Sequence, residues 1–313
     1  MSIAFVFPGQ GSQYVGMGKY FFQSCPTAAE IFERADHALD FPLSRLCFEG
    51  PEEELTKTAN TQPAVLAVSV ACLEVLKKAG GPAPSALAGH SLGEYTALVA
   101  ANSISFEDAL RMVRKRGQYM QEAVPLGAGG MAAVMGLSGD AVIEVCRKAA
   151  PSGVVEAANL NCPGQVVVAG DAAGLKAAEQ EAKKAGAKRF IELPVSAPFH
   201  SSLMIPAGER LARDLGEVDI SDPQIPVVAN VSADFVRTGK EVKDSLIRQV
   251  YSPVRWEESI RLLLAFGINI FVEVGPGKVL GGLIRKINRE VLVYNVEDKT
   301  SLEKVLALTG EVS

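Results

Sequence analysis

The sequence lacks the features that mark several common classes of protein. Basic residues do not outnumber acidic ones, because 31 Lys and Arg stand against 36 Asp and Glu and give a net charge of -5. A protein that binds nucleic acid needs a basic surface to displace the counterions of the phosphate backbone. We therefore expect no nucleic-acid partner, and an acidic protein could dock only on a local basic patch.

Cysteine is also scarce, and its spacing excludes two kinds of stabilising site. The five cysteines lie far apart with no CxxC pair: Cys25, Cys47, Cys72, Cys146 and Cys162. This spacing favours neither a zinc site nor a disulfide framework, so we expect no metal centre and a reducing compartment. The first residues, "MSIAFVFPGQG", lack a basic segment and read as a strand rather than a signal peptide, which favours a cytoplasmic location.

No apolar run is long enough to cross a membrane. The most apolar long segment, residues 63–76, is too short and too interrupted to span a bilayer, so we expect no membrane association. The chain has 313 residues, 48% of them hydrophobic and 21% charged, as is typical of a globular protein of enzyme size. This length suits one large domain or a domain with an insertion.

The order of strand and helix patterns predicts an α/β fold with an inserted unit. Up to residue 125, strand patterns (3–7 and 85–91) alternate with helical ones (62–80, 94–101 and 105–123), which is typical of an α/β sheet. From residue 131 the order becomes β-α-β-β-α-β, with strands at 131–137, 154–160, 165–170 and 188–195 and helices at 140–150 and 172–186. That order is ferredoxin-like.

We therefore predict a small ferredoxin-like subdomain over residues 127–196. Residues 1–126 and 197–313 would form the large subdomain. Its second part shows helical patterns near 202–215, 241–250, 256–266 and, as the last helix, 279–287, with strands at 225–232 and 269–275. These elements resume the α/β pattern and are expected to complete the first sheet.

The stretch "GHSLGEY" at residues 89–95 suggests a nucleophile. Ser91 lies between Gly89 and Gly93 where a strand pattern turns into a helix, which is the arrangement of a nucleophile elbow. The amino end of the helix would favour negative charge developing near this serine. A serine that only caps a helix fits the same five residues, so the rest of the chain must decide.

A nucleophilic serine needs a base, and the chain offers three histidines. His90 is expected to point away from Ser91 as a packed or hydrogen-bonded structural residue. His37 lies in a polar helical stretch and is expected on the surface. His200, in the loop "SAPFHSS" after the last strand of the insertion, is the favoured base. No acid stands out as a third member, so a backbone carbonyl could orient the imidazole in a Ser-His dyad.

The helical stretch 105–123 places one arginine on its apolar face. Arg116 shares that face with Ala109, Val113, Met120 and Ala123. A buried guanidinium needs an anionic partner. The partner is either an internal acid in a structural ion pair or a substrate carboxylate held by two hydrogen bonds.

The glycine-rich turn "FPGQGSQ" at residues 7–13 does not match a nucleotide-binding loop. It lacks the third glycine of the dinucleotide motif and the Gly-Lys-Ser of a phosphate loop. Gln10 could donate a hydrogen bond to an oxyanion, although a plain connection between strand and helix fits equally well.

Taken together, the motifs resemble those of the malonyl-CoA:acyl carrier protein transacylase family, which includes the acyltransferase domains of fatty acid and polyketide synthases. The matching stretches run in the family's order from about residue 5 to residue 287: "FPGQGSQ", "TQPA", "GHSLGEY", "RGQYMQ", "SAPFHS", "YSPVRW" and "EVGPGKVL". The resemblance implies an α/β-hydrolase-like large subdomain that carries the ferredoxin-like insertion.

The resemblance also implies a role for each site residue. Ser91 would be the acylated nucleophile, His200 its base and Arg116 the group that binds the malonyl carboxylate. The main-chain carbonyl of Gln249 would orient His200, which accounts for the missing acid. The remaining positions are the Leu92 N–H and a donor from Gln10 in the oxyanion hole, and Phe199, which is similar to the malonyl-type rather than the methylmalonyl-type loop.

The substrates implied are malonyl-CoA and an acyl carrier protein, with no bound cofactor. Candidate basic residues for the acidic carrier are Lys183, Lys184, Lys188, Arg189, Arg285, Lys286 and Arg289. Such clusters are also ordinary solvated helix faces, so the docking site stays open. Two other functions compete: a serine esterase or thioesterase, which the inward Arg116 disfavours, and a non-catalytic scaffold.

Overall fold

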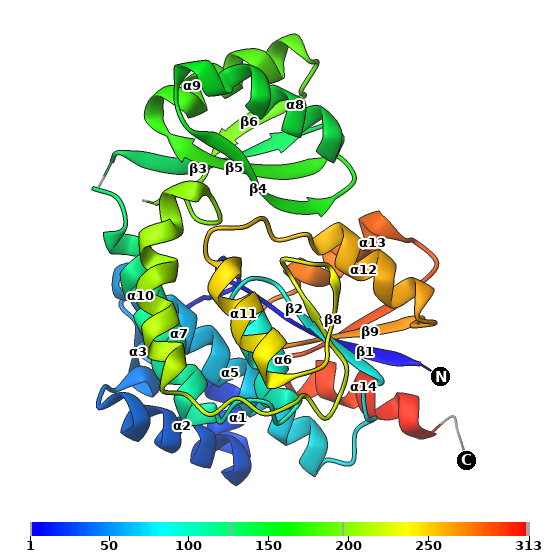
Figure 1. Ribbon diagram of the computed structural model, residues 1–313. Coiled ribbons are helices and arrows are strands. Elements are labelled where there is room, and N and C mark those ends of the chain that lie inside the picture. The colour runs from blue at the N-terminus through cyan, green and yellow to red at the C-terminus, as the bar shows by residue number, and fades with distance from the viewer. Residues whose placement is uncertain (1, 126, 196, 311–313) are drawn as a thin grey trace.

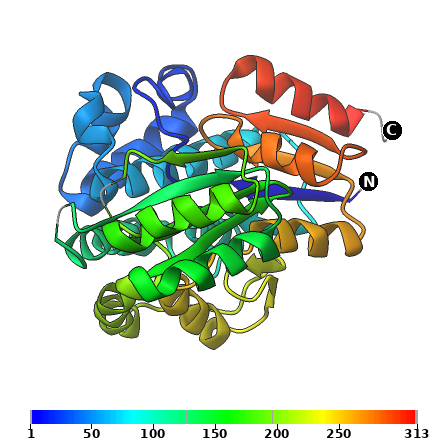
Figure 2. The same cartoon turned by 90° about the horizontal axis from the view of Figure 1, so that it is seen from above.

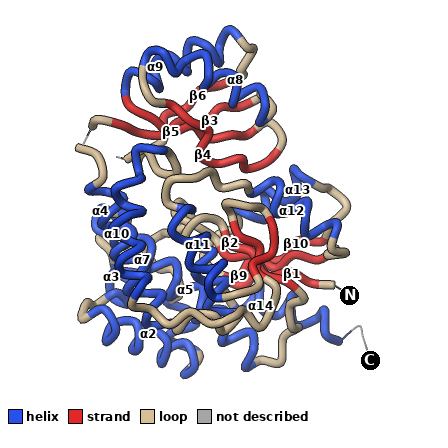
Figure 3. The backbone as a smooth tube through the Cα atoms, viewed as in Figure 1, coloured by secondary structure: helices blue, strands red, loops and turns tan. Residues whose placement is uncertain are grey.

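The strands lie in two separate sheets, one in each part of the molecule (Figures 1 and 3). The computed structural model describes residues 2–125, 127–195 and 197–310. The larger sheet has the strand order β10-β9-β1-β2-β7-β8. Its strands are β1 (Ile3–Phe7), β2 (Ala86–Gly89), β7 (Val227–Ala229), β8 (Asp234–Val236), β9 (Ile270–Val274) and β10 (Leu292–Val296). All neighbouring pairs are parallel except β7 and β8, which confirms the α/β prediction.

Helices cover both faces of the larger sheet, so its central strand β1 is buried along its whole length. Ile3, Phe5 and Phe7 face one apolar cluster, whereas Ala4 and Val6 face another. The first cluster includes α2 (Pro26–Leu39), α5 (Thr58–Lys78), α6 (Gly93–Ala100), α7 (Phe106–Glu122), α10 (Ile205–Gly216), α11 (Gly239–Gln249) and α14 (Lys299–Gly310). The second includes α12 (Trp256–Ala265) and α13 (Val279–Ile287).

One helix of the described residues, α5, is long and apolar enough to cross a membrane by length and composition. Within the molecule, 83% of its most apolar 18-residue window is buried. Its side chains pack against α2, α7 and the sheet strands β9 and β10. It is therefore a core helix, and its hydrophobicity serves packing inside this fold.

The smaller sheet confirms the predicted β-α-β-β-α-β unit. Its strand order is β4-β5-β3-β6, entirely antiparallel, as in the ferredoxin-like arrangement. The elements are β3 (Gly129–Met135), α8 (Gly139–Ala149), β4 (Val155–Cys162), β5 (Gln165–Asp171), α9 (Ala172–Lys184) and β6 (Arg189–Glu192). The predicted boundaries fall at residues 126 and 196, which lie outside the described residues, so the limits of the two subdomains remain a prediction.

The two faces of the smaller sheet have different partners. Ala132 and Val134 pack under α8 and α9, which lie on the side away from the larger sheet (Figures 1 and 2). Met131 and Ala133 point the other way and join the core of the large part. The alternation of side chains along β3 therefore builds the small unit and seats it on the large one.

The structure adds elements that were not predicted, including the short strand β8. The last helix was expected at 279–287, but β10 and α14 follow it. Strand β10 lies at the edge of the sheet and is only partly buried, so it lacks the apolar run of a central strand. The N-terminal part also holds three helices that were not predicted: α1 (Lys19–Ser24), α3 (Leu43–Glu49) and α4 (Glu52–Leu55). Helix α2 contains the helical stretch expected around His37.

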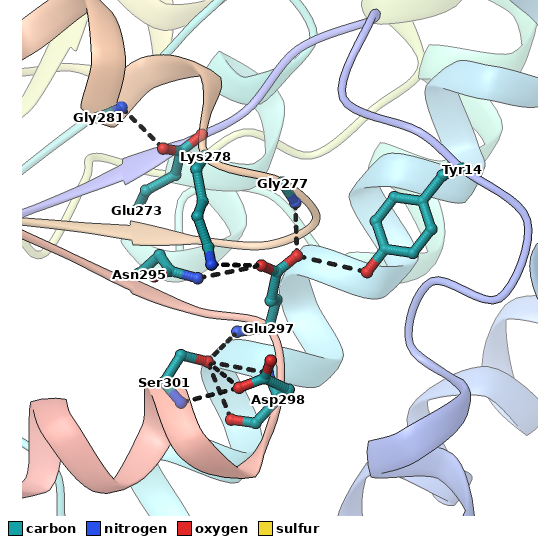
Figure 4. A network of polar contacts seen from close by, with 9 residues as sticks. All are labelled: Tyr14, Glu273, Gly277, Lys278, Gly281, Asn295, Glu297, Asp298 and Ser301. Atoms are coloured by element: carbon teal, nitrogen blue, oxygen red, sulfur yellow. Dashed lines mark hydrogen bonds and ion pairs between the residues drawn. The ribbon is translucent and has the colours of Figure 1, made fainter.

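Two glutamates, one on β9 and one directly after β10, bind N–H groups at the amino end of α13 and in the loop before it (Figure 4). Glu273, buried on β9, accepts hydrogen bonds from the N–H groups of Leu280 and Gly281 in the first turn of α13. Glu297 accepts one from the Gly277 N–H at 2.8 Å. These carboxylates accept hydrogen bonds from N–H groups that have no partner within α13, and so hold the amino end of this helix against the sheet.

Candidate active site

A sharp turn between β2 and α6 presents Ser91. Its φ of 52° lies in the left-handed region, which is strained for a residue with a side chain. A Cβ atom added to Gly89 would lie 1.9 Å from the carbonyl of Gly93, and one added to Gly93 would lie 2.1 Å from the Phe7 carbonyl oxygen. Both glycines are thus required by close backbone contacts, as predicted for a nucleophile elbow.

Asn230, which follows β7, holds this turn from the side. Its Oδ1 atom accepts the Ser91 N–H at 2.7 Å, and its Nδ2 atom donates to the Gly89 carbonyl at 2.7 Å. Strand β7 pairs with β2 in the sheet, which brings Asn230 next to the elbow. The sequence analysis missed this residue, and its place directly after a buried strand was the only available signal.

His200 lies against the Ser91 side chain. Its Nε2 atom is 2.8 Å from Ser91 Oγ, and its Nδ1 atom is 2.8 Å from the Gln249 carbonyl oxygen. A carbonyl can only accept, so Nδ1 carries the proton and Nε2 is free to accept one from the serine. Burial, followed by the positive charge of Arg116, lowers the pKa of His200 to about 3, which keeps the imidazole neutral near pH 7.

Arg116 is 1% exposed and meets the same serine. Its Nη2 atom donates to Ser91 Oγ at 3.0 Å and to Gln249 Oε1 at 2.9 Å, and Nη1 donates to Gln62 Oε1 at 2.8 Å. Within the described residues, no carboxylate forms an ion pair with Arg116 and its buried Nε atom has no hydrogen-bond partner. The internal ion pair considered above is therefore not found, and an N–H donor remains available.

The side chains of Ser91, His200 and Arg116 line a cavity of about 270 Å³ between the two sheets. Ser91 and His200 contribute from the large part, whereas Met131 and Val167 contribute from the small sheet. Leu280 and its neighbours on α13 close another side. A cavity with apolar walls and a few convergent polar groups is typical of a small-molecule site.

The remaining predicted site residues also border this cavity. They are Gln10, Leu92 and Phe199. The Gln10 side chain donates to Thr58 Oγ1 at 3.3 Å. Across the described part of the chain, no hydrogen-bond acceptor faces the Leu92 N–H. Their roles at an oxyanion and at the acyl group remain predictions.

The other two histidines lie where they were predicted. His90 Nε2 is 2.9 Å from Asn161 Oδ1, and its ring packs 5.5 Å from that of Trp256, so it is a hydrogen-bonded and packed residue. His37 is exposed on α2. Among the described residues, no group of three or more His, Cys, Asp or Glu side chains is placed to share a metal ion.

The sequence analysis missed Gln62 and the side-chain contacts of Gln249. Gln62, on α5, accepts from Arg116, and it lies in the "TQPA" stretch that was noted only as a family motif. Gln249 was predicted for its carbonyl, but its side chain also contacts Arg116 and Glu94. Both amides point inward from helices, which periodicity alone does not distinguish from core packing.

Comparisons with known proteins agree with this geometry. The family model "Acyl transferase domain" matches residues 4–305. The malonyl CoA-acyl carrier protein transacylase of Bacillus subtilis (strain 168) is 52% identical over 310 residues, covering 99% of this chain and 98% of that protein. The Escherichia coli (strain K12) protein of the same name is 46% identical over 305 residues, covering 97% and 99%.

Solved structures show the same fold. An acyl-carrier-protein S-malonyltransferase from Burkholderia pseudomallei 1710b superposes with a TM-score of 0.96 at 48% identity, covering 98% of this chain and all of that one. A malonyl-transacylase in complex with a type II PKS acyl-carrier protein has a TM-score of 0.96 at 43% identity, covering 98% and 100%. The chain described here belongs to the malonyl-CoA:acyl carrier protein transacylase family.

Proposed function

We propose that the protein transfers a malonyl group from malonyl-CoA to the phosphopantetheine thiol of an acyl carrier protein, which supplies extender units for fatty acid synthesis. One observation carries the proposal: the buried Arg116 guanidinium, which forms no ion pair with a carboxylate of the described residues, lies 3.0 Å from the serine hydroxyl that pairs with an imidazole. A substrate must therefore bring its own carboxylate next to the carbonyl that the serine attacks. The similar B. subtilis and E. coli proteins bear the name of this activity.

The first half-reaction acylates the enzyme. Ser91 Oγ attacks the thioester carbonyl while His200 Nε2 takes its proton. The Leu92 N–H and a donor from Gln10 stabilise the oxyanion of the tetrahedral intermediate. The carbon–sulfur bond then breaks, CoA leaves as a thiol with the proton from His200, and a malonyl-serine ester remains.

The second half-reaction uses the same groups in reverse. The carrier thiol gives its proton to His200 and attacks the ester carbonyl, the carbon–oxygen bond breaks, and Ser91 regains its proton. Gln249 holds His200 in the tautomer that both halves need. This ping-pong cycle takes malonyl-CoA as a substrate and draws on no resident cofactor.

Arg116 supplies the selectivity for a dicarboxylic acyl group. A planar guanidinium binds a carboxylate by two charge-assisted hydrogen bonds, and acetyl-CoA has no group to offer it. Phe199, buried at the cavity wall, limits the room around the acyl carbon. The site therefore suits malonyl better than acetyl or longer neutral acyl groups.

The test is to incubate the protein with malonyl-CoA, with and without a holo acyl carrier protein. Transfer is expected to give malonyl-carrier, with little free malonate when the carrier is absent. A thioesterase would release malonate at the same rate with or without the carrier, and a scaffold would leave malonyl-CoA intact. Either result would refute the proposal.

A role in a polyketide pathway is a second candidate. It is favoured by the 43% identity to a malonyl-transacylase solved with a type II PKS carrier. The ratio of kcat/KM for a fatty-acid carrier to that for a polyketide carrier separates the two roles. A higher value for the fatty-acid carrier is expected.

Docking of the carrier and the location in the cell remain predictions. Lys286, in the last turn of α13, donates to Gln165, which lines the cavity, so one of the candidate basic residues lies next to the site. A complementary charge there would attract an acidic carrier.

All five cysteines are unpaired, which supports the expected reducing cytoplasm.

A further inference from the structure

A buried carboxylate next to the site takes no part in the chemistry proposed above. Glu94 lies in the first turn of α6, three residues after Ser91, and is 1% exposed. Its Oε2 atom accepts the Asn230 N–H at 2.9 Å and the Gln249 Nε2–H at 2.7 Å. Buried carboxylates are costly unless they serve as acceptors or pair with a charge.

Both partners of Glu94 hold the backbone of the nucleophile. Asn230 Oδ1 accepts the Ser91 N–H at 2.7 Å, and Gln249 Nε2 donates to the Ser91 carbonyl at 3.0 Å. The Glu94 N–H donates to that same carbonyl at 3.1 Å. Both backbone polar groups of Ser91, its N–H and its carbonyl, are therefore hydrogen-bonded to residues that Glu94 contacts. These bonds hold the strained turn in place.

The carboxylate and the Ser91 carbonyl together set which way the Gln249 amide faces. An amide side chain can rotate by half a turn and exchange its oxygen for its NH₂ group. Glu94 Oε2 and the Ser91 carbonyl oxygen both accept from the Gln249 NH₂ group, at 2.7 Å and 3.0 Å, so this group faces Glu94. Its Oε1 atom then faces Arg116 Nη2, at 2.9 Å. A reversed amide would point its NH₂ group at the guanidinium, which can only donate.

We propose that Glu94 is a positioning residue for acylation, which orients the Gln249 amide and thereby aligns Arg116 with Ser91. This inference rests on the proposed malonyl transfer. In its ionised form Glu94 places a negative charge one amide away from Arg116, which favours burial of the guanidinium without occupying the N–H groups that a substrate needs. Burial raises the pKa of Glu94 to about 7, and the hydrogen bonds from Asn230 and Gln249 and the charge of Arg116 oppose that rise.

The test is a double-mutant cycle on malonyl transfer to the carrier. Glu94→Met keeps the length of the side chain and removes the acceptor, and Gln249→Leu removes the amide but keeps the carbonyl that binds His200. Glu94→Met alone is expected to lower kcat/KM by about 10- to 100-fold, by analogy with the loss of residues that orient metal ligands. In the Gln249→Leu background the further loss should be at least about fivefold smaller, because contacting residues are not additive.

Two further variants separate positioning from loss of structure. Glu94→Gln retains an oxygen that can accept, so it should lose less than Glu94→Met, and it replaces Glu94→Met in the cycle if the latter does not fold. Asp171→Asn is the control, since Asp171 is a partly buried carboxylate that caps α9 and accepts the Gly174 N–H, away from the active-site cavity; its kcat/KM should stay within about twofold of the wild type. Circular dichroism and thermal melting establish that each variant is folded.

The outcomes distinguish the two proposals. A wild-type protein that does not transfer malonyl would overturn the proposed function. If the wild type is active and the loss of kcat/KM in the double variant equals the product of the two single losses, the positioning role of Glu94 would be overturned. The proposed function would stand. The structure predicts a large loss of kcat/KM for Glu94→Met, a smaller loss for the same substitution in the Gln249→Leu background, and no loss for the control.

Discussion

The Nε2 atom of His200 lies 2.8 Å from the Oγ atom of Ser91, although 109 positions separate the two residues in the chain. Arg116 Nη2 donates to the same oxygen at 3.0 Å. One hydroxyl thus meets the base that would take its proton and the cation that would bind the substrate's carboxylate. Binding of the acyl group and activation of the serine are therefore expected to influence each other.

Substrate binding should raise the pKa of His200. Burial and the charge of Arg116 lower that pKa to about 3, and a malonyl carboxylate on Arg116 would offset the second cause. We expect a higher His200 pKa in the Ser91→Ala variant saturated with malonyl-CoA than in the same variant with acetyl-CoA, which lacks the carboxylate. NMR titration of the His200 ring measures both, and equal values would contradict this coupling.

Arg116→Ala should abolish the preference for malonyl-CoA. Two hydrogen bonds to a charged group contribute roughly 1.5–3 kcal/mol each, or about 3–6 kcal/mol together. At 1.4 kcal/mol for each factor of ten, kcat/KM for malonyl-CoA should fall on the order of 10²- to 10⁴-fold. The value for acetyl-CoA should change much less.

The control for that variant is Arg114→Ala, on the same helix. Arg114 points away from the cavity and donates to the Leu39 carbonyl, so its loss should leave the ratio of malonyl-CoA to acetyl-CoA turnover unchanged. An Arg116→Ala protein that keeps the wild-type ratio would show that another group binds the carboxylate.

Gly89→Ala should damage both the fold and the site. The new methyl group would lie 1.9 Å from the Gly93 carbonyl, so the elbow must open. Overpacking of this kind costs about 1–3 kcal/mol or more, and displacement of Ser91 should remove most of the acylation activity. Thermal melting and the rate of malonyl transfer measure the two effects.

Gly282→Ala is the matched control for that substitution. Gly282 is exposed on α13 and has open space where its methyl group would go. Alanine is the better helix former by about 1 kcal/mol, so this variant should be at least as stable as the wild type. Equal melting temperatures for the two alanine variants would argue against the close contact at the elbow.

The stability of the protein should depend on pH through Glu273. Burial raises the pKa of Glu273 from 4.5 to about 7. Between these values the folded state binds more protons than the unfolded state, so the free energy of unfolding falls as the pH rises from 4.5 through 7. A glutamine at this position cannot titrate.

The comparison of wild type with Glu273→Gln isolates this effect. The unfolding free energy of the wild type, taken relative to the variant, should fall by up to roughly 3 kcal/mol from pH 4.5 to pH 8. The hydrogen bond that the glutamine loses adds only a constant offset. Urea denaturation at both pH values measures the difference, and a difference that does not change with pH would rule out the shift.

Local patterns predicted the elbow and most elements of the smaller sheet and of the central strands, because these depend on neighbours in the sequence. The apolar stripe around Arg116 follows from the helical repeat, and the turn at Ser91 follows from its two glycines. His200 was singled out by elimination among three histidines, and its distance from Ser91 had to come from the structure.

Other features depend on tertiary contacts that carry no local signal. Asn230 reaches the elbow because β7 pairs with β2, and Glu94 is an acid on a helix that an ordinary pattern would place in the solvent. Strand β10 was missed because an edge strand is only partly buried. Sheet order and burial, which decide all three cases, are set by contacts between distant segments.

Peptide mass spectrometry after brief exposure to malonyl-CoA tests the central claim most directly. The account predicts one malonyl group, attached through an ester to Ser91, which is lost when holo carrier protein is added and is absent from Ser91→Ala. A malonyl group on a different residue would contradict the account. So would rapid formation of malonyl-carrier by the Ser91→Ala protein.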